Sequence, residues 1–359
     1  MKAPASLLFL CLVLLLAGCS ERDRPLESPV RFEGGIFGSF YQVTLADSLT
    51  QGEARALEEG ILEVLEAVDV SMSIYIEDSE LSAFNQSPLD EWQPLSDELV
   101  EVLAISQAVA EKSDGAFDVT MGGLVNLWSF GSEARPREVP DASELDERLE
   151  LVGFDAVELD PSGLQARRTR DVFVDLGGVA KGHATDRVAA YLDREGIEHY
   201  LVNLGGDLIA RGHRNAREAG DDEAEPWRIG IEAPLDDRQE AQYVLPIRDV
   251  SLATSGDYRN YFEEEGQRFS HTIDPRSGRP IGHSLASVSV LHPSNAWADA
   301  WATALMVLGD EAGMALAREQ DLKVLMIVRD GDDWQSRVSP AFVDAFGEER
   351  VAELGLEVH

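Results

Sequence analysis

This chain of 359 residues is poor in cysteine. Its two cysteines, Cys11 and Cys19, both lie near the N-terminus, so the rest of the chain has no thiol. An internal disulfide and a cysteine nucleophile are therefore excluded from the main part of the protein. Every mechanism that depends on a thiol is excluded with them.

Positive charge is also scarce. The chain has 67 acidic residues, a net charge of −37 and four lysines, which are Lys2, Lys112, Lys181 and Lys323. Such an acidic protein repels the phosphates of nucleic acid, so a nucleic-acid partner is excluded. The acidic residues are spread along the chain, which is typical of a solvated surface suited to high salt. Because lysine is so rare, Lys181 stands out as a candidate binding residue.

The chain has one pronounced apolar run near its N-terminus. Residues 6–16 form an apolar run that is short for a bilayer span but has the length of a signal-peptide core. The run ends in Leu-Ala-Gly-Cys, which resembles the bacterial lipobox. We predict a lipoprotein signal peptide over 1–18, acylation of Cys19 (palmitate type) and a linker over 19–31. The alternatives are a plain secretory signal and an anchor helix. Several acyl chains would hold the protein stably on a membrane.

Residues 32–359 are expected to form one α+β domain. Apolar periodicity and capping signals predict helices at 53–69, 96–112, 297–308 and from Ser143, whose Ser-Glu-Leu-Asp reads as a capping box, to before Gly153. Alternation and β-branched residues predict strands at 38–46, 171–176, 199–204, 227–233, 243–247, 286–292 and 323–328. The two kinds of element do not alternate strictly. A mixed sheet with packed helices is therefore favoured over a doubly wound sheet.

Two glycine pairs follow predicted strands. In VDLGGVAKGHATDR (174–187) a strand with Asp175 runs through glycines into a helix that opens with Lys181. Free amide groups at such a helix start can hold an anion, although a tight turn with a solvated lysine is the alternative. In NLGGDL (203–208) the glycines permit a positive φ or the close approach of a ligand. A simple hairpin turn explains this second pair equally well.

Asp299 and Thr303 lie four residues apart in the predicted helix 297–308, so they share one face. A carboxylate and a hydroxyl suit a hard cation such as Mg²⁺, which keeps coordination sites free for phosphate oxygens. The alternative is local, with the Thr303 hydroxyl bonding back to the Asp299 carbonyl. The pair is therefore a candidate metal site.

Three further segments carry candidate residues. EKSDGAFDVTMGGLVNLWSFG (111–131) could line a flat ring or form a loop with core anchors Phe117 and Trp128. SMSIYIEDSELSAFN (71–85) offers Tyr75, or simply a strand followed by a short helix capped by Ser79. In SHTIDPRSG (270–278) a type I turn follows a predicted strand that carries His271. Without a thiol beside it, this histidine is either structural or acts as a base or phosphate donor.

In this order, these segments resemble the FAD:protein FMN transferase (ApbE) family, from Gly38 to about Gly309. The resemblance implies an ApbE-like (T-fold-like) architecture and a Mg²⁺-dependent flavin transferase with FAD as substrate. It implies that FMN is attached through a phosphoester to a Thr or Ser hydroxyl of a partner flavoprotein, with release of AMP. Recipients in the family include redox-pump subunits and secreted reductases. A lipid-anchored enzyme on the periplasmic side of a bacterial membrane is the expected setting.

The resemblance also implies roles, motif by motif. His271 matches the catalytic histidine. Contacts to FAD are implied at Phe37, Tyr75, Ala116, Phe117, Asp118, Asp175, Lys181 and Ile273. Metal ligands are implied at the Gly178 carbonyl, Asp299 and Thr303. Two departures are Phe37, where methionine is common, and His183, where tyrosine is usual.

Two other functions stay open from the sequence. Water in place of a protein hydroxyl would make a Mg²⁺-dependent FAD pyrophosphatase that yields FMN and AMP, because both reactions share the metal and phosphate groups. A non-catalytic flavin-binding lipoprotein is the second alternative. The Asp299–Thr303 pair and His271 argue against it, since binding alone needs no base.

Overall fold

The structure is a computed structural model that describes residues 24–359 except 28, 217–223, 236–237 and 332. The predicted signal peptide and Cys19 lie outside the described residues. No helix within the described ranges has the length and apolar character needed to cross a membrane.

A nine-stranded sheet forms the centre of the molecule. In spatial order its strands are β1 (Val30–Ile36), β2 (Ser39–Leu45), β6 (Tyr200–Leu204), β7 (Asp207–Arg211), β10 (Val250–Gly256), β15 (Leu285–His292), β16 (Lys323–Asp330), β17 (Asp333–Val338) and β18 (Glu357–Val358). Neighbouring strands are antiparallel except the parallel pair β17–β18. The predicted mixed sheet is therefore confirmed. Strand β1 begins at Val30, inside the segment expected as a linker.

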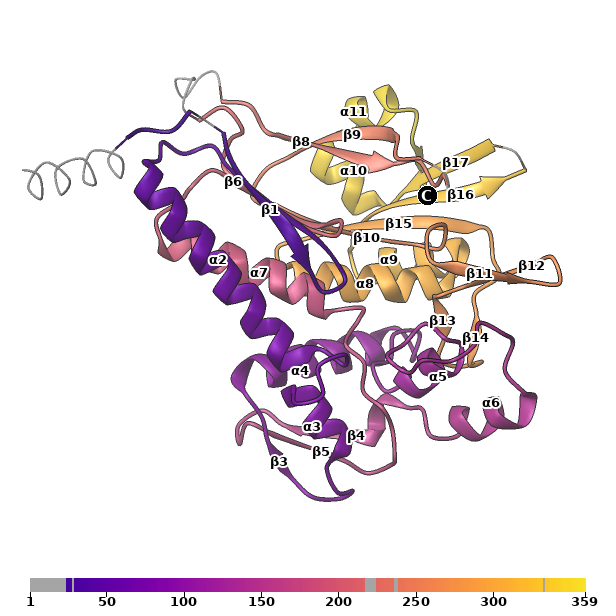
Figure 1. Ribbon diagram of the computed structural model, residues 1–359. Helices are drawn as coiled ribbons and strands as arrows, with labels where there is room; N and C mark the ends of the chain where they lie inside the picture. The colour runs from indigo at the N-terminus through magenta and orange to yellow at the C-terminus, as the bar shows by residue number, and fades with distance from the viewer. Residues whose placement is uncertain (1–23, 28, 217–223, 236–237, 332) are drawn as a thin grey trace, which may run out of the picture.

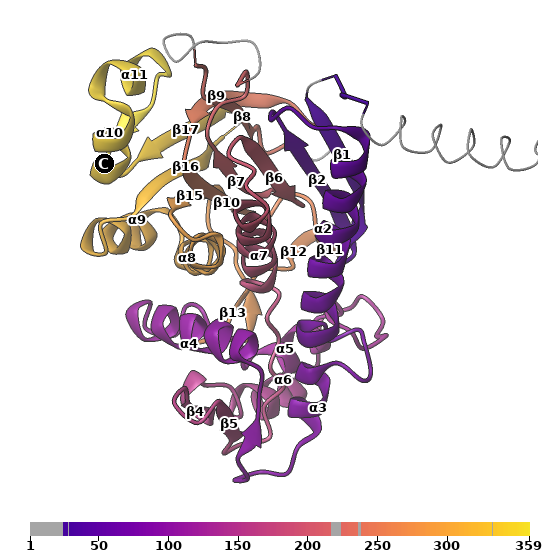
Figure 2. The same ribbon diagram turned by 90° about the vertical axis from the view of Figure 1, so that its left-hand side faces the viewer.

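Both faces of this sheet are covered (Figures 1 and 2). One face carries the helices α2 (Gln51–Met72), α7 (Ala180–Arg194), α8 (Asn295–Leu308) and α9 (Asp310–Glu319). The other carries the hairpin β8 (Trp227–Glu232)–β9 (Ala241–Ile247) and the helices α10 (Pro340–Phe346) and α11 (Glu348–Glu353). Because it is covered on both sides, β15 is buried along nearly its whole length, and its sequence is correspondingly rich in apolar and small residues.

A further layer lies beyond α7 and α8 (Figure 2). Its elements are α3 (Glu80–Gln86), α4 (Asp97–Lys112), α5 (Gly122–Leu127), α6 (Ala142–Leu149), the 3-10 turn Phe154–Ala156, and the small sheet of β3 (Gln93–Pro94), β5 (Gln165–Arg168) and β4 (Val157–Asp160). Two short hairpins follow β10 in the chain, β11 (Tyr261–Glu264)–β12 (Gln267–Ser270) and β13 (Ile273–Asp274)–β14 (Arg279–Pro280).

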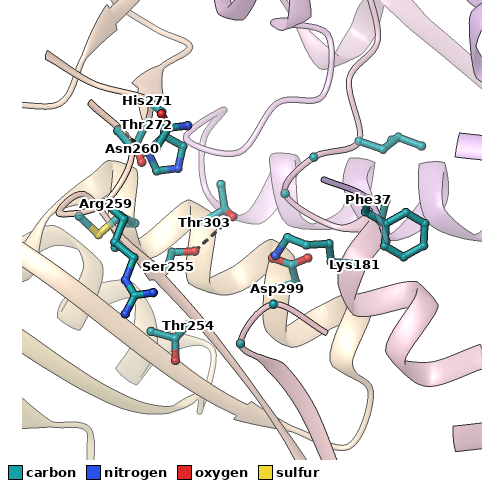
Figure 3. Close-up of a pocket in the computed structure, with 18 of the residues that line it drawn as sticks. Phe37, Lys181, Thr254, Ser255, Arg259, Asn260, His271, Thr272, Asp299 and Thr303 are labelled. Atoms are coloured by element: carbon teal, nitrogen blue, oxygen red, sulfur yellow. Dashed lines mark hydrogen bonds between the residues drawn. The ribbon is translucent and has the colours of Figure 1, made fainter. Parts of the chain in front are cut away.

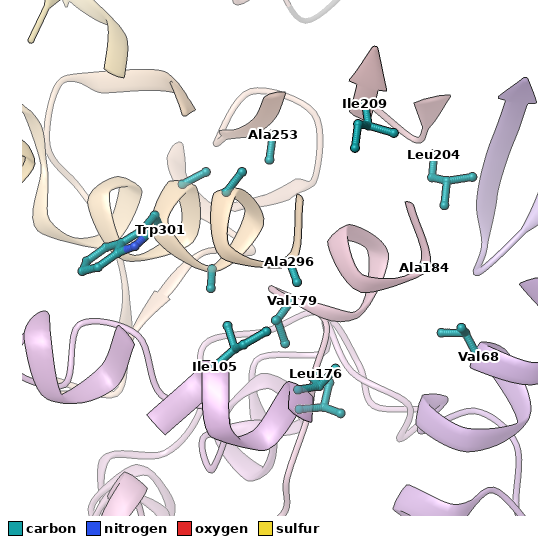
Figure 4. Close-up of a cluster of buried hydrophobic side chains, with 14 of the residues drawn as sticks. Val68, Ile105, Leu176, Val179, Ala184, Leu204, Ile209, Ala253, Ala296 and Trp301 are labelled. Carbon is teal, nitrogen blue, oxygen red and sulfur yellow. The ribbon is translucent and has the colours of Figure 1, made fainter. Parts of the chain in front are cut away.

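Helix α8 lies in the middle of the main core. It is apolar on nearly all sides, which suits a helix enclosed between the sheet and α4. Figure 4 shows Trp301 and Ala296 of α8 among side chains from the sheet, such as Ala253, and from other helices, such as Ile105 of α4. The small residues of α8 let the neighbouring backbones approach, so its polar residues are held firmly in place.

The long helices were predicted well from their periodicity and caps. Helices α2, α4 and α8 confirm the predictions at 53–69, 96–112 and 297–308, and Ser96 caps α4 by accepting from the Leu99 amide. The predicted capping box at Ser143 is wrong. Helix α6 begins one residue earlier, behind Asp141, and its start has no side-chain cap.

A predicted strand is also wrong. Segment 171–176 forms only one isolated bridge, from Phe173 to Met121. The amide and carbonyl of Val174 bond to the side chain of Asn85, while Phe173 and Asp175 bond to the backbone of residues 119–122. In 71–85, where a strand before a short helix was the alternative, α2 runs on to Met72 and turns and bends follow it. The predicted cap Ser79 does begin α3.

Candidate functional site

A cavity of about 850 Å³ opens between the sheet, α8 and the loops around α7. This volume suits a sizeable organic ligand. Every described residue for which the resemblance implied a role lines it, namely Phe37, Tyr75, Ala116, Phe117, Asp118, Asp175, Gly178, Lys181, His271, Ile273, Asp299 and Thr303. The tertiary structure thus brings together residues that are widely separated along the chain.

One wall of the cavity carries an ion pair that is buried on its acidic side. Lys181 lies in the first turn of α7, and its ammonium pairs with the carboxylate of Asp207 on β7, which is 1% exposed. Burial alone would lower the pKa of Lys181, but the carboxylates of Asp207 and Asp299 raise it above its ordinary value. The lysine therefore stays charged, and the alternative of a freely solvated lysine is wrong.

The second glycine pair forms the turn that places Asp207. Gly205 and Gly206 both have positive φ, 61° and 107°, and they close the β6–β7 hairpin. A Cβ on Gly205 would lie 2.6 Å from the Ser39 hydroxyl. The hairpin explanation of this motif is confirmed, and the turn also leads the chain to the carboxylate that pairs with Lys181.

Asp299 and Thr303 lie on the face of α8 that borders the cavity, as their spacing predicted (Figure 3). The carboxylate of Asp299 accepts a hydrogen bond from the Gly182 amide at 3.1 Å. Burial and the nearby Asp207 raise the pKa of Asp299 to about 7. The Thr303 hydroxyl lies 3.4 Å from the Ser255 hydroxyl.

The donor set fits a hard cation. A Cβ on Gly178 would lie 3.1 Å from the Thr303 hydroxyl, so the Gly178 backbone runs directly beside that oxygen. In the part of the chain that the structure describes, no three His, Cys, Asp or Glu side chains group as a metal site. A cation here would therefore take one carboxylate together with hydroxyl and backbone oxygens. Mg²⁺ accepts such a set because it retains waters and phosphate oxygens. Binding a cation would also favour the ionised form of Asp299.

His271 lies across the cavity from Lys181 and Asp299 (Figure 3). Its Nδ1 is 3.0 Å from the Asn260 carbonyl oxygen, which also accepts the backbone amide of His271 at 3.0 Å. A carbonyl oxygen can only accept, so Nδ1 carries the proton and Nε2 is left as an acceptor. Burial lowers the pKa of His271. The imidazole is therefore neutral near pH 7 and able to take a proton.

The turn after His271 is anchored in a small aromatic core. The Gly278 amide donates to the Asp274 carbonyl at 2.8 Å, and Gly278 has a φ of 67°. The Trp128 indole donates to the Gly278 carbonyl at 2.8 Å, and Ile273 packs beside Trp128. The predicted turn and the core anchor Trp128 are confirmed. His271 itself lies between β12 and β13, so its predicted place within a strand is wrong.

Two of the predicted FAD contacts, Asp118 and Asp175, also accept hydrogen bonds from their own loops. The Asp118 carboxylate accepts the Thr120 amide and hydroxyl at 2.8 and 2.7 Å, and the Asp175 carboxylate accepts the Gly177 amide at 2.8 Å. Burial raises the pKa of both carboxyls. These two aspartates shape the loops around the cavity as well as lining it.

Three aromatic residues border the cavity from separate elements. Phe37, with a φ of 52°, forms the tip of the β1–β2 hairpin. Tyr75 is 71% exposed at the rim, while Phe117 is buried beside Gly178. This arrangement leaves apolar surfaces on which a flat ring could stack.

Asp207, which pairs with a cavity residue, and Arg259, which lines the cavity, were both missed from the sequence. Asp207 follows a glycine pair, and its importance depends on Lys181, to which the fold brings it. Arg259 extends into the cavity near Ser255 and pairs with Glu232 of β8 (Figure 3). Its signal in the sequence was weak, because arginine is common in this chain and nothing local marks Arg259.

Comparison with known proteins adds independent findings. The sequence profile of the ApbE family matches residues 37–326. An FAD:protein FMN transferase of Vibrio cholerae serotype O1 is 40% identical over 336 residues, 94% of this chain and 97% of that protein. The FAD:protein FMN transferase of Escherichia coli K12 is 36% identical over 341 residues, which cover 93% and 95% of the two chains.

Solved structures agree with these sequence matches. The flavin transferase ApbE from Vibrio cholerae superimposes with a TM-score of 0.79 at 38% identity, covering 88% of this chain and 99% of that one. The apo flavinyl transferase ApbE of Pseudomonas stutzeri gives a TM-score of 0.79 at 35% identity, with coverages of 89% and 97%. The similarity therefore extends over nearly the whole of both proteins.

Proposed function

This chain belongs to the ApbE family and is an FAD:protein FMN transferase, and we propose that it works with Mg²⁺ on a Thr or Ser hydroxyl of a partner flavoprotein. The acceptor oxygen bonds to the phosphorus of the FMN half of FAD. The bond from that phosphorus to the bridging oxygen breaks, and AMP leaves with this oxygen. FMN is then held on the partner through a phosphoester.

The observation that carries this proposal is the contact of the His271 Nδ1 with the Asn260 carbonyl oxygen at 3.0 Å. Nδ1 donates in this contact, so Nε2 is a free acceptor within the cavity. This nitrogen takes the proton of the attacking hydroxyl, which makes His271 the general base. An alcohol is a weak nucleophile until its proton is removed, so the step requires such a group.

The opposite wall holds the phosphates. Lys181 presents a permanent positive charge beside the start of α7, where amide groups and the helix dipole favour anions. Asp299, Thr303 and the Gly178 carbonyl would hold Mg²⁺. When bound, the ion neutralises phosphate charge and polarises the phosphorus. The apolar surfaces of Phe37, Tyr75 and the 116–118 segment, with Asp175 and Ile273, would surround the remainder of FAD.

We further propose a lipid anchor at Cys19 that places the enzyme on the periplasmic face of a bacterial membrane. The lipobox-like sequence before this cysteine supports the proposal, as does the absence of any other thiol after it in the sequence. Suitable recipients there are redox-pump subunits and secreted reductases. Replacing Cys19→Ala should release the protein from membranes with its activity intact, and continued membrane attachment would contradict acylation.

The reaction is tested with purified enzyme, FAD, Mg²⁺ and a recipient domain, read by intact mass and by AMP release. The expected result is FMN on the recipient with one AMP per FMN attached, and no labelling when the acceptor Thr is replaced by Ala. AMP with free FMN and an unlabelled recipient would establish a pyrophosphatase instead. FAD binding without AMP release would instead indicate a non-catalytic flavin-binding protein.

A further inference from the structure

The start of α8 is capped by a different helix. Its N-cap residue, Ser294, makes no side-chain bond to its own helix. Instead the Asp186 carboxylate of α7 accepts from the Ser294 hydroxyl at 2.7 Å, the Asn295 amide at 2.7 Å and the Ala296 amide at 3.0 Å. Amides at a helix start need acceptors, and a negative charge there also suits the helix dipole. Asp186 therefore serves as the cap of α8.

Each of these two helices supplies a carboxylate that accepts hydrogen bonds from the start of the other. Asp186 of α7 accepts from the first turn of α8, and Asp299 of α8 accepts from the Gly182 amide in the first turn of α7. The backbones touch at this point, since a Cβ on Gly182 would lie 2.4 Å from the Asn295 carbonyl oxygen. The Asn295 side chain also donates to the carbonyls of Leu208 and Leu252, which joins α8 to β7 and β10.

We infer that Asp186 is a positioning residue of the transfer reaction. It holds the start of α8 against α7, and this contact sets where Asp299 and Thr303 lie relative to Gly178 and Lys181. The inference rests on the function proposed above, in which these oxygens hold the cation. A displacement of about 1 Å at such a site can lower a rate about 100-fold. Asp186 itself contacts neither the reacting atoms nor the cation, and it acts through α8.

The test uses the full domain with Mn²⁺ as the metal probe, read by electron paramagnetic resonance. Replacing Asp186→Asn removes the charge and sets an amide NH₂ group against amide donors. Mn²⁺ affinity should fall about 10- to 100-fold, as for other residues that orient metal ligands. The Mg²⁺ concentration for half-maximal transfer should rise in parallel. The matched control is Asp193→Asn on the same helix, which weakens the bond from the Tyr200 hydroxyl and should leave Mn²⁺ affinity unchanged.

A double variant separates positioning from mere capping. Adding Ser294→Asp to Asp186→Asn gives α8 a cap of its own but does not restore the contact with α7. The melting temperature should recover while Mn²⁺ affinity stays low. If Asp186→Asn alone does not fold, Mn²⁺ affinity is measured on the double variant instead. Recovery of Mn²⁺ affinity with stability, or wild-type affinity in Asp186→Asn, would overturn the inference. Failure of the proposed function shows separately, as wild-type enzyme that binds Mn²⁺ but does not transfer FMN.

Discussion

The role assigned to His271 leads to a quantitative prediction. In His271→Gln the side-chain amide can still donate to the Asn260 carbonyl, but it cannot accept a proton from the substrate near pH 7. Loss of a general base typically costs about 10²- to 10⁴-fold in rate, which is about 2.7 to 5.4 kcal/mol of activation free energy. FAD and Mg²⁺ binding should change little, because His271 lies across the cavity from Lys181 and Asp299.

The pH dependence of transfer gives a second measure of the same role. Burial lowers the pKa of His271 below its ordinary value of 6.5, and only the neutral imidazole is a base. The wild-type rate should therefore rise with pH, with the midpoint of the rise below pH 6.5. In His271→Gln this rise should be absent over the same range.

The assay is single-turnover labelling of a recipient domain at saturating FAD and Mg²⁺ between pH 5 and 8, about the range over which histidine titrates. FAD affinity is measured in parallel by flavin fluorescence. The control is His199→Gln. In the wild type the Nδ1 of His199 accepts the His213 amide outside the cavity, so the rate of this variant should equal that of wild type. A wild-type rate in His271→Gln would refute the assignment, as would the same rise of the rate with pH in this variant as in wild type. Asp274 would then become the next candidate.

Three further predictions concern the metal, acid stability and salt. Asp299→Asn should abolish most transfer at low Mg²⁺ and recover partly at high Mg²⁺, while FAD titration shows nearly normal affinity. Burial lowers the pKa of His183 to about 4, so the folded state keeps it neutral and stability is lost as pH falls from 6.5 toward 4. In denaturant unfolding at pH 7 and 4.5, His183→Gln should lose about 2 to 3 kcal/mol less than wild type, and equal losses would contradict this. The melting temperature should climb from dilute buffer to about 1 M NaCl, where the Debye length is about 3 Å; a flat curve would contradict the role of charge repulsion.

Local features of the fold could be predicted because their causes are local. The shared face of Asp299 and Thr303 follows from the 3.6-residue period of a helix, and the turn before Gly278 follows from the conformational preferences of proline and glycine. The strand predicted at 171–176 failed although its apolar alternation is real. A distant side chain, Asn85, bonds both backbone groups of Val174, and only a short stretch at 119–122 bonds Phe173 and Asp175. Periodicity describes burial, and it does not say which group will satisfy the backbone.

The sequence by itself determined which chemical groups this protein has: it has no thiol after Cys19 and very few lysines. Its motifs also predicted, through the family resemblance, which residues line the cavity. Only the tertiary structure decided how these groups act on one another. Lys181 meets Asp207 across 26 positions of the chain, and Asp186 caps α8 across 108 to 110 positions. Ion pairing, the pKa of Asp299 and the proton on Nδ1 of His271 all depend on distance and burial. These quantities exist only once the sheet and α8 have brought the separate segments to one cavity.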